Sequence, residues 1–514
     1  MADPRPGEDP SRPLHRSGSA ARAPILVVLV GALILGGLID RAPGAAAPAV
    51  VSSVQPVPVA APAQALSSSW FCAGATDDHL GAGADRGVAP GAVVIANSGS
   101  AAATGVVTLV PSVGSQVQIP VSVGADGQTV INEDVPAGAA WIGAIVDINA
   151  GGVAVEQRID GSLGETSAPC ATAGSSQWYF PTGATLVNAA VVISLLNPYP
   201  TDAVVDMSFT TAEGLEQPQE FQAVLVPRDG LVSVNLGDHL RRRQAIATTV
   251  TARSGRVVAW KTDVVTPPAS GAVLLGTPAA SAPLADPAAP IPGVTLTLGE
   301  PAPATEWTWA DGVAGDGVDE QYVIYNPGPA TAQLRLSLDL QQGEAEPFDL
   351  SVGPYQVNAV VSSEEVRIPP GVSHSAILQS INGVPVVAER TISATSPSAW
   401  SGLGELPGGQ LAADRWLVAT DPANSHYDGT VVLYNPGSVT IQAILAGLDG
   451  RAQVPLSTIT VGPGRRAAFA LDDLRGVVDE PFVVSASGPV YVESDYYGIN
   501  GTPGISLSFG VPLS

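Results

Sequence analysis

The sequence has little charge and few aromatic side chains for its length. Only 13% of its 514 residues are charged, 5% are aromatic, and Lys261 is the single lysine. Acidic residues outnumber basic ones by 47 to 22, for a formal charge of −25, and the longest basic run covers only residues 241–243. A nucleic-acid partner needs clustered cations that displace phosphate counterions, so this balance argues against that class of partner. We expect residues 241–243 to form a solvated loop.

Long apolar runs are equally scarce, because only residues 23–39 form one of membrane-spanning length. Its 17 residues would extend about 26 Å as a helix, close to the ~30 Å hydrocarbon core of a bilayer. Arginines precede the run, so the positive-inside rule predicts a cytoplasmic tail at 1–22 and export of everything after residue 41. The run is either a single-pass membrane anchor, which its length favours, or a signal peptide whose cleavage would leave the protein secreted.

Cysteine is nearly absent, and both copies, Cys72 and Cys170, lie in the part predicted to be exported. A pair of cysteines in an exported protein usually forms a disulfide. A bridge that closes a loop of about 100 residues stabilises by roughly 4.7 kcal/mol in the chain-entropy estimate. We therefore predict a disulfide between Cys72 and Cys170.

Glycine and proline are abundant by contrast, with 56 and 46 residues. Two stretches combine proline with alanine, a composition that favours an extended chain of the polyproline type. Residues 40–66 are predicted to form a stalk, and residues 266–304 a linker.

Four markers recur in one order four times, which indicates internal repeats. Each copy has a tryptophan, then an apolar run that ends in asparagine, a Val-Gly or Val-Pro pair 27–30 residues later, and a last marker 58–63 residues after the asparagine. The tryptophans are Trp70, Trp178, Trp307 and Trp416; the asparagines are Asn97, Asn197, Asn326 and Asn435; the pairs end at Gly124, Pro227, Gly353 and Gly462; the last markers are Glu156, Trp260, Glu389 and Glu493.

The repeats predict an all-β fold. Alternating apolar and polar residues, as at 330–340, are typical of half-buried strands, and residues 472–480 are the best candidate for a helical turn. Turn signals every 8–12 residues favour tandem Ig-like β-sandwiches, whereas a propeller blade needs only about 45 residues. We expect four β modules in two pairs on either side of the linker, at residues 67–173, 174–265, 305–404 and 405–514.

Two repeated residue types invite a chemical interpretation. Paired carboxylates hydrolyse glycosides only when they lie about 5–9.5 Å apart, whereas equivalent residues of separate modules should be far apart. The recurring glutamates are therefore expected to be structural, for example through pairing with Arg390. The tryptophan clusters at 178–180 and 307–309 are typical of core packing, with stacking on a glycan as the alternative.

Acidic loops offer a weak possibility of a calcium site, because calcium prefers oxygen ligands. None has the EF-hand spacing, so solvated turns are expected and no cofactor is predicted. The residues concerned are Asp77, Asp78, Asp85, Asp311, Asp316, Asp319, Glu320, Asp421 and Asp428. The five histidines are scattered, and no catalytic or metal-binding residue is predicted.

The layout resembles a family of uncharacterised actinobacterial exported proteins. The resemblance rests on the single apolar segment, the Ala/Pro stalk, Trp-Phe-Cys at 70–72 and the Asn-Pro-Gly repeats, from which the first two copies depart. It implies a membrane-anchored, extracytoplasmic protein and transfers no catalytic residue.

Three functions are compatible with these observations. The leading hypothesis is a non-enzymatic, membrane-tethered protein of the cell envelope that presents β modules to a protein partner. The alternatives are a glycan-binding protein of the envelope that uses the tryptophan clusters, and an envelope hydrolase.

Overall fold

The computed structural model describes residues 58–76, 91–136, 138–266, 291–343, 345–419, 426–450, 453–471 and 481–513. The chain divides into two compact units, residues 1–53 and 54–514, and all described residues belong to the second. The predicted membrane segment at 23–39 and the predicted helical turn at 472–480 lie outside the described residues. Within the described ranges, no helix has the length and apolar character needed to cross a bilayer.

The described residues form an all-β fold with several separate sheets, as the alternating pattern predicts. In β20 (Ala332–Leu340) every even-numbered position is buried, and the odd-numbered ones are exposed or half-buried. This pattern follows from the period of two along a strand with one face on a core. β2 (Gly91–Asn97) is buried along its whole length, which explains its continuous apolar sequence.

One strand order occurs four times along the chain, and we call the corresponding stretches segments 1 to 4. Each segment has one sheet in the order first, sixth, third, fourth and another in the order fifth, second, seventh, eighth. In segment 4 the sixth and seventh strands are a single strand, β31 (Phe482–Gly498), which pairs with both sets of neighbours. In segment 2 two short strands, β12 and β13, pair with β11 in place of one fourth strand.

Segment 1 consists of β1 (Ser68–Thr76), β2, β3 (Ala103–Pro111), β4 (Val117–Val123), β5 (Gly127–Asn132), β6 (Trp141–Ile148), β7 (Val153–Gly161) and β8 (Gly164–Pro169). Segment 2 consists of β9 (Gln177–Phe180), β10 (Ala189–Asn197), β11 (Ala203–Thr211), β12 (Gly214–Glu216), β13 (Val224–Val226), β14 (Gly230–Asn235), β15 (Ala247–Ser254), β16 (Val258–Val265) and β17 (Gly293–Leu298), with 3-10 helices η1 (Gln219–Phe221) and η2 (Leu236–Asp238).

Segment 3 consists of β18 (Glu306–Trp309), β19 (Val318–Asn326), β20, β21 (Phe348–Val352), β22 (Gln356–Val361), β23 (His374–Ser380), β24 (Val387–Ala394) and β25 (Gly402–Pro407), with the 3-10 helix η3 (Ser362–Glu364). Segment 4 consists of β26 (Ala413–Val418), β27 (Tyr427–Asn435), β28 (Ile441–Leu448), β29 (Gln453–Val461), β30 (Arg465–Ala470), β31, β32 (Ile505–Phe509) and β33 (Val511–Pro512).

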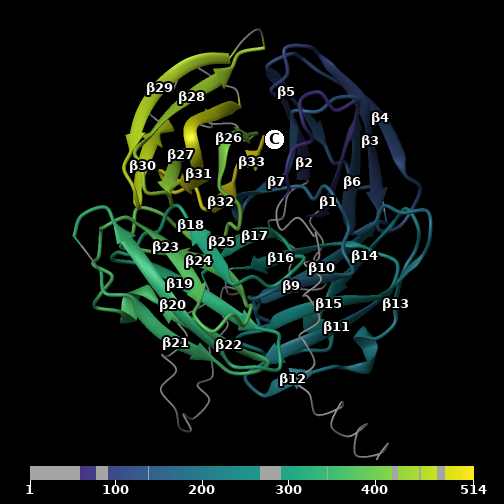
Figure 1. Ribbon diagram of the computed structural model, residues 1–514. Coiled ribbons are helices and arrows are strands. Elements are labelled where there is room, and N and C mark those ends of the chain that lie inside the picture. Colours follow the sequence, from purple (N-terminus) through teal and green to yellow (C-terminus); the bar gives the residue numbers. More distant parts are fainter. Residues whose placement is uncertain are drawn as a thin grey trace, which may run out of the picture. The chain divides into compact units, whose positions relative to one another are not determined.

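The last edge strands of the four segments, β8, β17, β25 and β32, contact one another in a closed cycle. β17 contacts β8 and β25, and β32 contacts β25 and β8, so segment 4 returns to segment 1 (Figure 1). The backbones approach very closely where the cycle closes. A Cβ on Gly164 would lie 2.4 Å from Gly504 Cα, and both glycines have a positive φ, of 118° and 120°. Only glycine fits at this crossing.

Two buried cores support the segments. One gathers side chains mainly from segments 1 and 2, and the other mainly from segments 3 and 4. The predicted disulfide is present: Cys72 in β1 is bonded to Cys170, the residue that follows β8, and their Cα atoms lie 4.9 Å apart. Residues 58–66 differ from the expected stalk, since the Ala60 N–H donates to Pro512 O at 3.0 Å and Ala60 is buried. The predicted linker at 266–304 is also wrong in its described part, because β17 pairs with β16 and belongs to the sheet of segment 2.

Candidate functional site

The four edge strands end around a small pocket, which we call the junction pocket. Each strand contributes the residue that pairs with the last sequence marker of its own segment. These residues are Pro169 opposite Glu156, Leu298 opposite Trp260, Pro407 opposite Glu389 and Phe509 opposite Glu493. The equivalent register position of each of the four segments therefore contributes one residue to the pocket.

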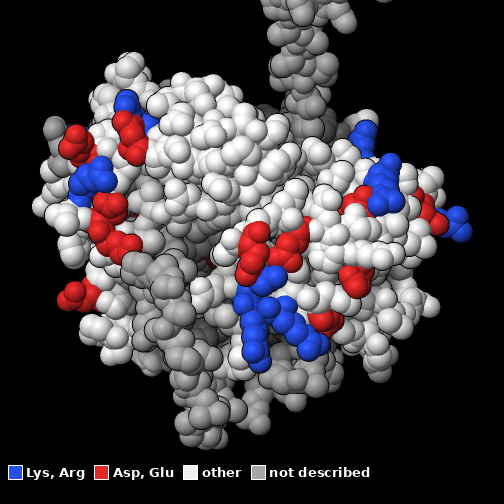
Figure 2. All heavy atoms as spheres, turned by 90° about the horizontal axis from the view of Figure 1, so that it is seen from below, with Lys and Arg blue, Asp and Glu red and all other residues white. Residues whose placement is uncertain are grey.

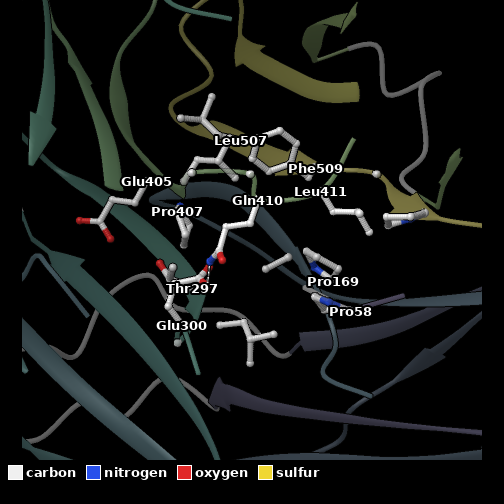
Figure 3. Close-up of a pocket in the computed structure, with 18 of the residues that line it drawn as sticks. Pro58, Pro169, Thr297, Glu300, Glu405, Pro407, Gln410, Leu411, Leu507 and Phe509 are labelled. Carbon is white, nitrogen blue, oxygen red and sulfur yellow. Dashed lines mark hydrogen bonds between the residues drawn. The ribbon is translucent and has the colours of Figure 1, made fainter. Parts of the chain in front are cut away.

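The junction pocket holds about 60 Å³ and is mainly apolar. Its apolar lining includes Leu296, Leu406, Leu411, Trp416 and Leu507. One polar pair interrupts it, because Gln410 Nε2 donates to Glu300 Oε2 at 3.0 Å, as the dashed line in Figure 3 shows. Burial, followed by the nearby Glu389 carboxylate, raises the pKa of Glu300 well above its ordinary value. The pocket thus combines an apolar cavity with a hydrogen-bonding pair, in which burial favours the uncharged form of Glu300.

The wall between segments 2 and 3 contains a buried charge cluster centred on Lys261. Its Nζ lies 2.9 Å from Glu405, 3.1 Å from Asp263 and 3.6 Å from Glu389. Burial lowers the pKa of Lys261, but the three carboxylates outweigh that effect and raise it above the ordinary value. Burial also raises the pKa of Glu389 to about 7, against the lowering effect of Lys261. In Figure 3 the Glu405 carboxylate points away from Leu507 and Phe509, out of the junction pocket.

Sequence reasoning missed this cluster. The available signal was a lone lysine in the middle of the apolar strand β16, a place where a cation has to be paired.

The recurring glutamates connect neighbouring segments through hydrogen bonds. Glu156 accepts from Ala419 N in segment 4 at 3.3 Å, and Glu389 accepts from Thr182 Oγ1 in segment 2 at 2.6 Å. Glu493 accepts from the backbone N–H groups of residues 310 and 311 in segment 3. Each glutamate therefore bonds to the residues that follow the tryptophan of the preceding segment. For Glu156 the preceding segment is segment 4, because the cycle of edge strands closes between segments 4 and 1.

A second buried cluster lies between segments 3 and 4. Arg390 is fully buried, and its Nη2 lies 2.5 Å from Glu493 and 3.4 Å from Asp495. The pairing of a recurring glutamate with Arg390 is thus found for Glu493 of the next segment and not for the adjacent Glu389. Burial lowers the pKa of Arg390, but the carboxylates of Glu493 and Asp495 outweigh this effect and raise the pKa above its ordinary value. The guanidinium therefore stays charged.

The side chains of the recurring asparagines hold loops together through hydrogen bonds to the backbone. The side-chain amide of Asn326 donates to Ala330 O at 2.8 Å and to Val352 O and Gly353 O at 3.0 Å, while its Oδ1 accepts from Gly328 N at 3.0 Å. The same pattern, with partners two, four and 26–29 residues onward, occurs at Asn97, Asn197 and Asn435. All four side chains are buried, so they hold the Val-Gly or Val-Pro turn and are not a binding surface.

The recurring tryptophans are buried as well, with at most 3% of their surface exposed. Three of them donate their indole N–H to the carbonyl three residues before the last marker of the segment. These bonds join Trp178 to Val257, Trp307 to Val386 and Trp416 to Val490. Buried indoles are core and do not present a face for stacking on a sugar, which removes the observation behind the glycan-binding alternative.

Three of the acidic loop residues that the structure describes are engaged by protein groups. Asp311 pairs with Arg466, Glu320 lies 2.9 Å from His374 Nε2, and Asp319 accepts from Ser363 Oγ at 2.8 Å. Four of the candidates, Asp77, Asp78, Asp85 and Asp421, lie outside the described residues. No group of three or more His, Cys, Asp or Glu side chains is arranged for a metal ion within the described part of the chain.

Surface charge is sparse and mixed in sign on the face shown in Figure 2, where blue and red side chains adjoin over a mainly uncharged surface. Arg243 pairs with Glu213 at 3.1 Å and Glu216 at 3.0 Å, while Arg241 and Arg242 are exposed. The basic run is therefore a solvated loop with one residue held by ion pairs.

Comparison with known proteins assigns a family. A model described as a family of unknown function (DUF5719) matches residues 129–398, more than half of the chain. The chain belongs to this family. Its match runs from β5 of segment 1, through segment 2, to just beyond β24 of segment 3. No curated protein matches the chain.

Among solved structures, the chain is similar to an α-L-rhamnosidase of Streptomyces avermitilis complexed with L-rhamnose. The identity is 10%, the alignment covers 79% of this chain and 54% of that chain, and the TM-score is 0.11. The chain thus spans about half the length of that enzyme, and at this TM-score the likeness carries no argument.

Proposed function

We propose that this chain is a non-enzymatic, membrane-tethered protein of an actinobacterial cell envelope whose β modules present a surface to a protein partner. In this proposal residues 23–39 anchor the chain in the membrane and everything that follows is extracytoplasmic. The disulfide supports export, because disulfides persist mainly in oxidising compartments.

We further propose that segments 1 to 4 are four copies of one Ig-like sandwich, arranged as two pairs. The recurring strand order and the recurring hydrogen bonds of the asparagines and tryptophans support the common origin. The two hydrophobic cores support the pairing, because each is shared mainly by two consecutive segments.

The junction pocket is the observation that carries the interaction role. Interfaces are dominated by a few anchors that fill well-packed pockets. A space of about 60 Å³ with apolar walls suits one apolar side chain of a partner, and the Glu300–Gln410 pair supplies polar atoms beside it. Leu411 lines the pocket and is 37% exposed, so it is placed to contact the partner.

The test is site-specific photo-crosslinking in intact cells. A photoreactive amino acid replaces Leu411 in the full chain, and a matched chain carries it at Val187, an apolar residue of segment 2 that is 88% exposed. We expect one protein to be crosslinked from position 411 and not from 187. The purified partner should then bind the native chain, and Leu411→Asp should weaken this binding at least tenfold, the effect of losing about 1.4 kcal/mol.

Three outcomes would overturn the proposal. They are equal crosslinking from both positions, crosslinks from position 411 only to polysaccharide, and a partner whose affinity does not change in Leu411→Asp. Circular dichroism of the variant provides the control that the fold is intact.

A further inference from the structure

The outermost strand of segment 4 presents an open sheet edge. β29 ends the sheet that also contains β28, β31 and β26, and among the described strands it pairs only with β28, at the periphery of segment 4 (Figure 1). It runs for nine residues, and every side chain except that of Val461 is exposed or half-buried. An edge strand carries unpaired backbone N–H and C=O groups, so it is a template for pairing with a further strand.

The equivalent edges of the other segments carry features that block such pairing, namely proline, charge and short strands. β4 has Pro120 as its central residue, and the edge of segment 2 is broken into β12 and β13, of three residues each. β21 has five residues and carries Asp349, which pairs with Arg335. In β29 the one proline, Pro455, lies near the start, so residues 456–461 keep their backbone N–H groups and carry no charge.

The surface around this edge is uncharged as well. β28, β29 and residues 482–489 of β31 contain no Asp, Glu, Lys or Arg. In each other segment the corresponding strands contain at least one such residue, for example Asp147, Asp206 and Asp349. A chain with a formal charge of −25 repels its own copies. Two copies therefore approach most easily through a surface without charge.

The side chains along the edge suit a copy of the same strand. Thr458 and Thr460 are exposed, and Thr458 lies opposite Ile444 of β28, which is 41% exposed. Antiparallel pairing of residues 456–461 with themselves brings threonine and β-branched side chains together across the contact, and such cross-strand pairs are stabilising. Because both partners use the same strand, a two-fold axis closes the contact and covers both edges.

We propose that a second copy of this chain pairs with β29 through residues 456–461, antiparallel and about a two-fold axis. The sheets that end in β29 then join into one continuous sheet across the dimer. Main-chain hydrogen bonds supply the affinity, as in other cases of strand addition. This edge shares no residue with the junction pocket, so either proposal can fail without the other.

The test measures the mass of the purified full chain in detergent by sedimentation velocity. Concentrations run from about 1 µM to 1 mM, at about 0.15 M salt, where long-range repulsion is screened. We expect a reversible equilibrium between monomer and dimer. Thr458→Lys places a positive charge on each copy at the contact, where like charges repel, so the dimer dissociation constant should rise at least tenfold.

Two control variants separate the edge from general effects. Thr458→Val keeps the size and the β-branched shape of the side chain and should leave dimerisation unchanged. Ser351→Lys places the same charge at an exposed position of β21, the equivalent edge of segment 3, and should also leave it unchanged. Circular dichroism of each variant checks that the fold is intact.

Three outcomes would overturn the proposal. The first is a chain that stays monomeric across the whole concentration series. The second is a dimer that Thr458→Lys leaves intact, because that dimer forms through another surface. The third is equal weakening by Thr458→Lys and Ser351→Lys, because that result reports net charge and not a contact at β29.

Discussion

Segments 1 and 3 share one strand order but are held to their neighbours in different ways. Segment 3 uses buried charge on both sides, because Glu389 lies 3.6 Å from Lys261 of segment 2 and the adjacent Arg390 lies 2.5 Å from Glu493 of segment 4. Segment 1 has Glu156 and Gln157 at the same two positions, with no cation, and its covalent bridge lies within the segment. One backbone arrangement thus accepts either a charged or a largely neutral boundary.

The difference matters because buried charge is costly unless it is paired. Replacing a whole buried ion pair by apolar groups is often neutral, whereas removal of one partner leaves an uncompensated charge. The charged boundaries of segment 3 should therefore be sensitive to single substitutions. Segment 1 should depend more on its covalent bridge.

The disulfide should give the largest effect. Replacing both Cys72 and Cys170 with alanine releases a loop of 98 residues, which costs about 4–5 kcal/mol in the chain-entropy estimate. Denaturant unfolding of the oxidised native chain and of the double variant measures the difference. A loss below about 1 kcal/mol would show that segment 1 is held mainly by other contacts.

Arg390→Met should come next, with a loss of about 3–5 kcal/mol, because it leaves Glu493 and Asp495 buried without their cation. Ser494 occupies the same register position in segment 4, and its buried hydroxyl has no hydrogen-bond partner among the described groups. Ser494→Ala is therefore the matched control and should be nearly neutral. Similar losses for the two variants would contradict the distinction between charged and neutral boundaries.

The boundary between segments 4 and 1, where Glu156 lies, can be tested through the pH dependence of stability. Burial raises the pKa of Glu156 to about 7, only partly offset by the hydrogen bond from Ala419 N. Because the folded state holds the proton more tightly than the unfolded state, this group lowers stability as pH rises from about 4.5 to 7. Glu156→Gln keeps the acceptor and should be up to about 3 kcal/mol more stable than the native chain above pH 7.

The same variant should match the native chain at pH 4, where Glu156 is protonated in both states. Thermal unfolding across this pH range gives both values. A constant difference between the two chains at all pH values would show that Glu156 is not buried uncharged at the closing boundary.

Much of this architecture was predictable from the sequence, because it depends on local pattern. The alternation in β20 and the recurring asparagine turns follow from spacing, and the pairing of Cys72 with Cys170 follows from their being the only two cysteines, in a part of the chain expected to be exported. The closed cycle of edge strands was not predictable, because it depends on how Gly164 and Gly504 meet across 340 residues. The junction pocket and the Lys261 cluster arise from the same long-range contacts, and neither has a motif.

The asparagines provide the smallest effect and the sharpest check on the comparison. Asn97 and Asn326 hold equivalent turns in the two segments that differ most at their boundaries. If the segments differ only there, Asn97→Ala and Asn326→Ala should each cost about 1–3 kcal/mol, because the buried carbonyls lose their donor. The exposed Asn358 is the control, and Asn358→Ala should be nearly neutral. Unequal losses at the two turns would mean that the boundary chemistry extends into the interior of each segment, since the local hydrogen bonds are the same.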